Sequence, residues 1–84
     1  MDRLEYELVT LRNNKQYFVL SSLMHEYNIY DLVLNVEDEN DTKIVLQENK
    51  NGKVIFSDVN DRELLRTLSP LFTSKIKEKQ MSIN

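Results

Sequence analysis

The sequence predicts an α+β fold in which a five-stranded antiparallel meander is followed by a helical C-terminus that packs on one face. Two observations predict the sheet: apolar residues recur with a period of two before residue 60, and an Asn51-Gly52 pair separates two strand-like runs. A third observation predicts the helical region, because after residue 59 the apolar period changes from two to about 3.6. We expect one domain over residues 1–84, with the sheet over about 3–59, helices over 60–79 and a frayed tail over 80–84.

The composition is typical of a small folded domain. The chain has 84 residues, of which 40% are hydrophobic and 30% charged, and this is too apolar for a disordered segment. The absence of cysteine excludes disulfides and cysteine-based metal or thiol chemistry. No apolar run approaches the ~20 residues of a membrane span, and the first residues lack the pattern of a signal peptide. We therefore expect a cytoplasmic domain that does not enter a membrane.

Charge is distributed unevenly along the chain. Residues 1–60 carry six basic and eleven acidic side chains, whereas residues 61–84 carry five basic and three acidic ones. An acidic sheet region repels the phosphates of nucleic acids. The basic residues Lys75, Lys77 and Lys79 form too small a cluster for a nucleic-acid site, and lysine near a helix C-terminus also complements the helix dipole.

The first two strands are predicted at residues 3–11 and 16–23, joined by a polar turn. The first segment alternates apolar and acidic residues, as in a half-buried strand. The second is rich in β-forming residues, namely Tyr17, Phe18, Val19 and Leu20.

Residues 25–30 mix polar and aromatic types without a period and are interpreted as a loop. The third strand is expected at residues 31–36 because apolar residues alternate there. Residues 37–41 are acidic and unfavourable in strands, so they are expected to turn the chain into a fourth strand around Ile44-Val45-Leu46.

The register of the last hairpin has two possible solutions. A two-residue type I′ turn at Asn51-Gly52 places Ile44 and Leu46 on one face with Ile55, Ser57 and Val59, and Phe56 then points to the other face. A three-residue loop over Lys50-Asn51-Gly52 instead places Ile44 and Leu46 with Val54 and Phe56. The second solution is favoured because its apolar face is more uniform.

The helical region has a stripe of apolar residues and an interruption at Pro70. Asn60 is suited to cap the first helix, with Glu63 three residues later. Ser69-Pro70 favours two short helices, over residues 61–68 and 70–79, because proline fits the first turn of a helix. One helix kinked at Pro70 is the alternative. The stripe consists of Leu64, Leu65, Leu68, Leu71 and Phe72.

No pattern in the sequence indicates a catalytic, cofactor or metal site, nor a small-molecule substrate. His25 is the one histidine and has no local partner of the kind that general-base catalysis requires. The acidic cluster at residues 37–41 lacks the glycine and glutamate positions of a calcium-binding loop, since Lys43 and Asn49 stand there. We therefore expect a protein that is not an enzyme.

Surface aromatic residues are the remaining candidates. Tyr27, Ile29 and Tyr30 lie in the expected loop, which has more large apolar groups than a solvent-exposed loop usually carries, and tyrosine is enriched in protein interfaces. Val33, Val45 and either Ile55 or Phe56 are expected on the sheet face opposite the helices, which one helical layer does not cover. We expect that face to associate with another protein, with Tyr27, Tyr30 and Phe56 as the anchors.

Three segments carry a resemblance to a known family. They are Lys15-Gln16-Tyr17-Phe18-Val19-Leu20, Ile44-Val45-Leu46 and Asp58-Val59-Asn60-Asp61-Arg62-Glu63-Leu64. In their order, and in the acidic stretch between them, the chain resembles the small YrzB-like proteins of Firmicutes. The basic tail and the Ser69-Pro70 interruption depart from the family's usual ending. The resemblance implies a cytoplasmic domain without assigned activity and carries over no site residue.

The predicted function is that of a non-enzymatic protein–protein interaction module, with a homodimer as one form of the association. The alternative is a small acidic inhibitor, similar to phage antagonists, that occupies the basic groove of a nucleic-acid-binding enzyme. The eleven acidic residues before residue 61 suggest this alternative.

Overall fold

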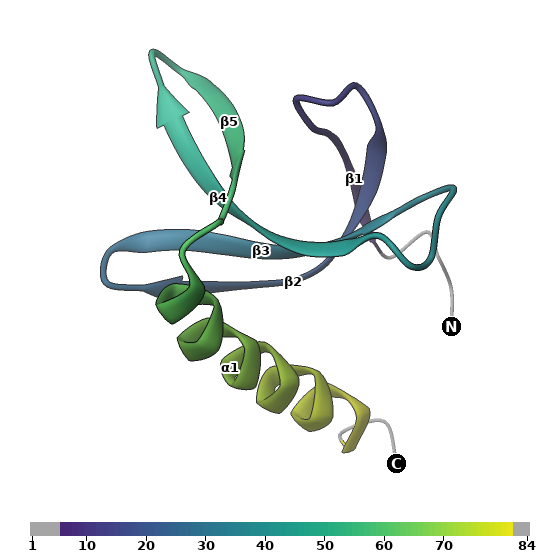
Figure 1. Cartoon of the computed structure of the whole chain (residues 1–84), viewed down its shortest axis with the longest axis vertical. Helices are drawn as coiled ribbons and strands as arrows, with labels where there is room; N and C mark the ends of the chain where they lie inside the picture. The colour runs from purple at the N-terminus through teal and green to yellow at the C-terminus, as the bar shows by residue number, and fades with distance from the viewer. Residues whose placement is uncertain (1–5, 82–84) are drawn as a thin grey trace.

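A computed structural model, which describes residues 6–81, confirms the α+β class. Within this range five antiparallel strands form one sheet in the order β1-β2-β3-β4-β5, as predicted, and one helix follows them. Figure 1 shows β1 and the β4-β5 hairpin bending to one side of β2 and β3, with α1 on the other side. The elements are β1 (Glu7–Thr10), β2 (Gln16–His25), β3 (Asn28–Asn35), β4 (Thr42–Lys50), β5 (Lys53–Asp58) and α1 (Arg62–Met81).

β1 pairs with only the first part of β2, from Glu7 opposite Val19 to Thr10 opposite Gln16. The predicted strand at residues 3–11 is thus confirmed over residues 7–10, and its residues 3–5 lie outside the described range. Beyond this pairing, the register of β2 against β3 shifts between Val19 and Ser21. Such an irregularity increases the local twist, which helps to curl the sheet.

The expected loop over residues 25–30 is wrong. β2 ends at His25 and β3 begins at Asn28, so only Glu26 and Tyr27 form the turn. Both have positive φ, 48° and 70°, as a two-residue type I′ turn requires. The sequence pattern concealed the turn because Asn and Gly are the residues usually found there, and Glu and Tyr are uncommon at positive φ.

The favoured three-residue loop over Lys50-Asn51-Gly52 is also wrong. Lys50 pairs directly with Lys53, and Asn51 and Gly52 form a two-residue turn with φ of 53° and 81°. Phe56 therefore lies on the face opposite Ile55, as the first of the two predicted registers requires. Turn geometry prevailed over uniformity of the apolar face, because each face of this sheet has its own core.

α1 is one helix, and not the two short helices that the Ser69-Pro70 pair favoured. It begins after Asp61, whose Oδ1 accepts hydrogen bonds from the backbone nitrogens of Glu63 (3.0 Å) and Leu64 (3.3 Å). Asp61 is therefore the N-cap, where Asn60 was expected. Residues 80 and 81, expected to fray, are helical, whereas residues 82–84 lie outside the described range.

Packing explains why the helix continues through Pro70. Leu68 and Phe72, on either side of the proline and one turn apart, are almost fully buried, with exposed fractions of 0% and 2%. Proline within a helix costs about 3 kcal/mol, and burying two large apolar side chains offsets this. Leu71, expected in the apolar stripe, instead remains 44% exposed.

The sheet has a core on each face. On the helix face, α1 packs over Tyr30 and Ile44. On the other face, which we call the inner face, Tyr17, Val33 and Val45 are each 0% exposed. Leu11 and the half-buried side chains of Val9, Val19 and Phe56 pack against these three residues.

The inner-face core corrects one further expectation. That face was predicted to be available for association because one helical layer cannot cover it. Curling of β1 and the β4-β5 hairpin toward the same side encloses it instead (Figure 1). Val33 and Val45 are therefore structural residues and not part of an exposed surface.

Candidate functional site

Three large apolar side chains gather at the end of the β2-β3 hairpin. Met24 and Ile29 are paired across the two strands, so their side chains lie side by side on the inner-face side of the sheet. They are 69% and 37% exposed, and Tyr27 in the turn is 99% exposed. We call Met24, Tyr27 and Ile29 the hairpin-end surface.

Tyr27 is unfavourably placed in two respects. Its ring is fully in solvent, and its backbone has a φ of 70°, a left-handed conformation that bulky residues rarely adopt. The corresponding turn between β4 and β5 uses Asn51 and Gly52, which adopt this conformation readily. Local stability therefore does not explain a tyrosine at position 27, and residues held in such conformations concentrate at functional sites.

The structure separates the three predicted anchors. Tyr27 lies on the hairpin-end surface, whereas Tyr30 is 4% exposed and belongs to the core beneath α1. Phe56 is half-buried against the inner-face core. In the sheet register it aligns with Ile29 across Gln47, so it lies in the same row as the hairpin-end surface but two strands away.

Met24 was missed by the sequence analysis, which ended the second strand at residue 23. The feature that identifies Met24 is its strand pairing, because a two-residue turn at Glu26 and Tyr27 places Met24 directly opposite Ile29. Once the turn is placed correctly, the alternation along β2 puts Met24 on the inner-face side of the sheet.

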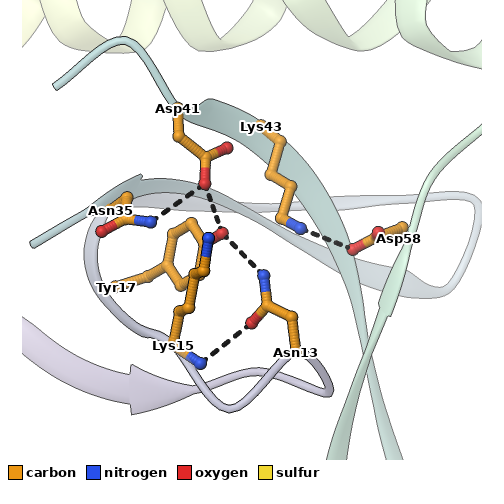
Figure 2. A network of polar contacts seen from close by, with 7 residues as sticks. All are labelled: Asn13, Lys15, Tyr17, Asn35, Asp41, Lys43 and Asp58. Atoms are coloured by element: carbon orange, nitrogen blue, oxygen red, sulfur yellow. Dashed lines mark hydrogen bonds and ion pairs between the residues drawn. The ribbon is translucent and has the colours of Figure 1, made fainter. Parts of the chain in front are cut away.

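A polar network occupies the opposite end of the inner face (Figure 2). The hydroxyl of Tyr17 donates to Asp41 Oδ2 at 2.5 Å and accepts from Asn13 Nδ2 at 3.0 Å. Asn35 Nδ2 donates to the same Asp41 oxygen at 3.1 Å. These bonds connect the β1-β2 turn to the loop before β4, and the two that Asp41 accepts, from Tyr17 and then Asn35, hold its pKa below the ordinary value. A carboxylate of this kind is not suited to donate protons at neutral pH.

Lys43 joins this network from above the Tyr17 ring. Its Nζ lies 5.2 Å from the ring centroid and 3.1 Å from Asp58 Oδ1. Burial of Lys43 acts to lower its pKa, but the hydrogen bond and charge of Asp58 outweigh this and raise it. Every group in the network thus has a stabilising partner, and we assign the network a structural role.

Asp31 is a buried carboxyl group with 2% of its surface exposed. Burial raises its pKa, the hydrogen bond from Ser22 Oγ at 2.5 Å opposes this, and the negative charge of Glu7 adds to the rise. Buried polar groups require hydrogen-bond partners, and the Ser22 hydroxyl is the partner of the buried Asp31 carboxyl group. The backbone oxygen of Ser22 accepts a separate hydrogen bond from the side chain of Lys75, which attaches α1 to β2.

The remaining sequence candidates bring no further chemistry together. His25 is half-buried in β2. In the described range, no group of three or more His, Cys, Asp or Glu side chains is arranged to hold a metal ion. No helix of residues 6–81 is long and apolar enough to cross a membrane.

A scan against protein-family models finds no match, and searches of the curated proteins and of the solved structures likewise find none. The resemblance to the YrzB-like proteins therefore stays a prediction.

Proposed function

We propose that this protein is a non-enzymatic protein–protein interaction module that binds through the hairpin-end surface. The observation that carries the proposal is Tyr27, a fully exposed aromatic ring held at a φ of 70° in the turn of a hairpin whose paired residues Met24 and Ile29 are also exposed. Contiguous exposed apolar groups mark interaction sites, and tyrosine and methionine are enriched at them. We place the module in the cytoplasm, a proposal supported by the absence of cysteine.

The partner to test first is a second copy of the chain. Sedimentation equilibrium over a wide range of concentration should show a reversible dimer for the parent chain and a monomer for Tyr27→Asn. Asparagine tolerates the left-handed conformation better than tyrosine does. The variant should therefore unfold at an equal or higher urea concentration while it loses association, and this separates a binding defect from a folding defect.

Two further variants complete the experiment. Met24→Thr with Ile29→Thr keeps β-forming side chains and should also give a monomer. Leu71→Gln, which removes an exposed apolar side chain from α1, should associate like the parent chain. Self-association that is equally strong in Tyr27→Asn and the parent would contradict the proposed surface. A parent chain that stays monomeric, and captures no protein in a manner that depends on Tyr27, would contradict the function.

The acidic inhibitor remains a second proposal, supported by the loop that joins β3 and β4. Glu37, Asp38 and Glu39 are exposed there and form no ion pair with any described residue. Binding to a basic groove should weaken steeply between about 50 and 200 mM salt, whereas an apolar interface should respond little. The salt dependence of partner binding therefore distinguishes the two functions.

A further inference from the structure

A second apolar surface lies on the helix face, near β1. Register places Phe18 of β2 between Leu8 and Leu34 on this face. The side chains buried by α1 lie toward the other end, around Tyr30 and Ile44. A groove of 490 Å³ opens where the sheet extends beyond this contact, and no described side chain of α1 lines it. Its apolar lining comprises Tyr6, Phe18, Leu20, Leu34 and Val36.

One rim of the groove is strongly acidic. Glu37, Asp38 and Glu39 line it and are all exposed. None of the three forms an ion pair with a described residue, although Asp38 Oδ1 accepts a hydrogen bond from the backbone nitrogen of Asn40 at 3.0 Å. Three carboxylates that have no ion-pair partner among residues 6–81, beside an apolar floor, repel phosphate and other anions and attract cations.

We propose that this groove binds a peptide segment of a partner protein in which apolar side chains are flanked by lysine or arginine. The volume is within the range of ligand sites and accommodates a few side chains. The apolar groups of such a segment fill the floor while its cations face the acidic rim, and this charge complementarity selects against acidic segments. The proposal does not depend on the hairpin-end surface, which lies on the other side of the sheet.

The probe is a short fluorescein-labelled peptide with two leucines flanked by lysines. Two matched peptides replace the lysines with glutamates or the leucines with serines. Amide NMR spectra of the isotope-labelled chain should show shifts at Leu20, Leu34 and Val36 with the leucine–lysine peptide. The glutamate peptide should produce none, and the serine peptide should bind more weakly by fluorescence anisotropy.

Variants locate the interaction and separate it from the proposed function. Glu37→Gln with Glu39→Gln should weaken peptide binding by about three- to tenfold, as expected for two exposed ion pairs. The control pair Glu26→Gln with Glu63→Gln changes net charge equally at exposed positions away from the groove and should bind like the parent. Tyr27→Asn, which removes the tyrosine ring from the hairpin-end surface, should also retain peptide binding.

Four results would overturn the inference, and three of them concern the peptides and the variants. In the first, the leucine–lysine peptide shifts no amide signals, or shifts only those of residues away from the groove. In the second, the glutamate peptide binds as tightly as the leucine–lysine peptide. In the third, the control pair of glutamate substitutions weakens peptide binding as much as the pair in the groove. Shifts of the groove amides that depend on protein concentration without peptide would assign the groove to a second copy of the chain, and would overturn it as well.

Discussion

Asp31 places a carboxyl group in the interior of a small domain, and the pH dependence of stability should report its burial. Its pKa is raised above the ordinary value of 3.8. Between about pH 3.8 and the higher pKa of the folded state, the folded chain therefore keeps a proton on Asp31 that the unfolded chain has already lost. The stability that this proton confers is complete below about pH 3.8 and is lost as pH rises through the folded pKa. The ionised form of Asp31 therefore destabilises the fold at neutral pH.

Asp31→Asn should remove the loss of stability that accompanies ionisation of Asp31. The amide oxygen still accepts the hydrogen bond from Ser22, and no charge is buried. We expect the variant to have a larger free energy of unfolding than the parent at neutral pH, with the difference shrinking toward acid pH. Urea denaturation at several pH values measures this, with Asp38→Asn as the exposed control. An unchanged pH profile for Asp31→Asn would show that the carboxyl group is accommodated without penalty.

Asp41 should behave in the opposite sense. Hydrogen bonds from Tyr17 and Asn35 lower its pKa, so its contribution to stability is present above the unfolded value and is lost as pH falls through the folded one. Tyr17→Phe keeps the buried ring beneath Lys43 but removes the hydroxyl group. The variant should be less stable at neutral pH and should lose less stability on acidification, as followed by thermal unfolding. Tyr27→Phe removes an exposed hydroxyl and should match the parent.

At the scale of elements, the period of apolar residues predicted five strands and a helical C-terminal region, whereas the connections and the continuity of the helix were less predictable. The acidic turn over residues 37–41 was correct, because the residues there are typical of turns. The turn at Glu26 and Tyr27 was not predictable from turn chemistry, since neither residue favours the conformation it adopts. That one error also concealed Met24, so Tyr27 is the one residue of the hairpin-end surface that was predicted as an anchor.

Pro70 shows how tertiary packing overrides a local signal. It lies inside α1, where it cannot donate the hydrogen bond that the carbonyl of Arg66 would otherwise accept. Pro70→Ala restores this donor at an exposed position and should increase the free energy of unfolding by about 1–3 kcal/mol. Ser69→Ala, an exposed neighbour, is the control for helix propensity in thermal denaturation. A Pro70→Ala variant no more stable than the parent would mean that the helix accommodates the proline without loss.

At the scale of the whole molecule, the curled sheet separates two cores and contributes residues to both. A chain of 84 residues has a free energy of unfolding of roughly 4–12 kcal/mol, so the loss of a few kcal/mol in either core is a large fraction of the total. Successive residues of β3 point to opposite sides, with Leu32 toward α1 and Val33 toward the inner face. Sequence periodicity could not show this arrangement, because enclosure of the inner face depends on the curl and not on the pattern of any one strand.

Because β3 contributes to both cores, damage to one should unfold the other. Leu68→Ala on the helix side and Val33→Ala on the inner face each remove a fully buried side chain and should lower the free energy of unfolding, by about 2–5 kcal/mol for the leucine. In each variant, far-ultraviolet circular dichroism and tyrosine fluorescence should give coincident urea transitions. Tyr17 and Tyr30 make the fluorescence sensitive to both cores, since one tyrosine lies in each. If Leu68→Ala separated the helical signal from the tyrosine signal, α1 would be an appended element, and the sheet would be stable through its inner-face core alone.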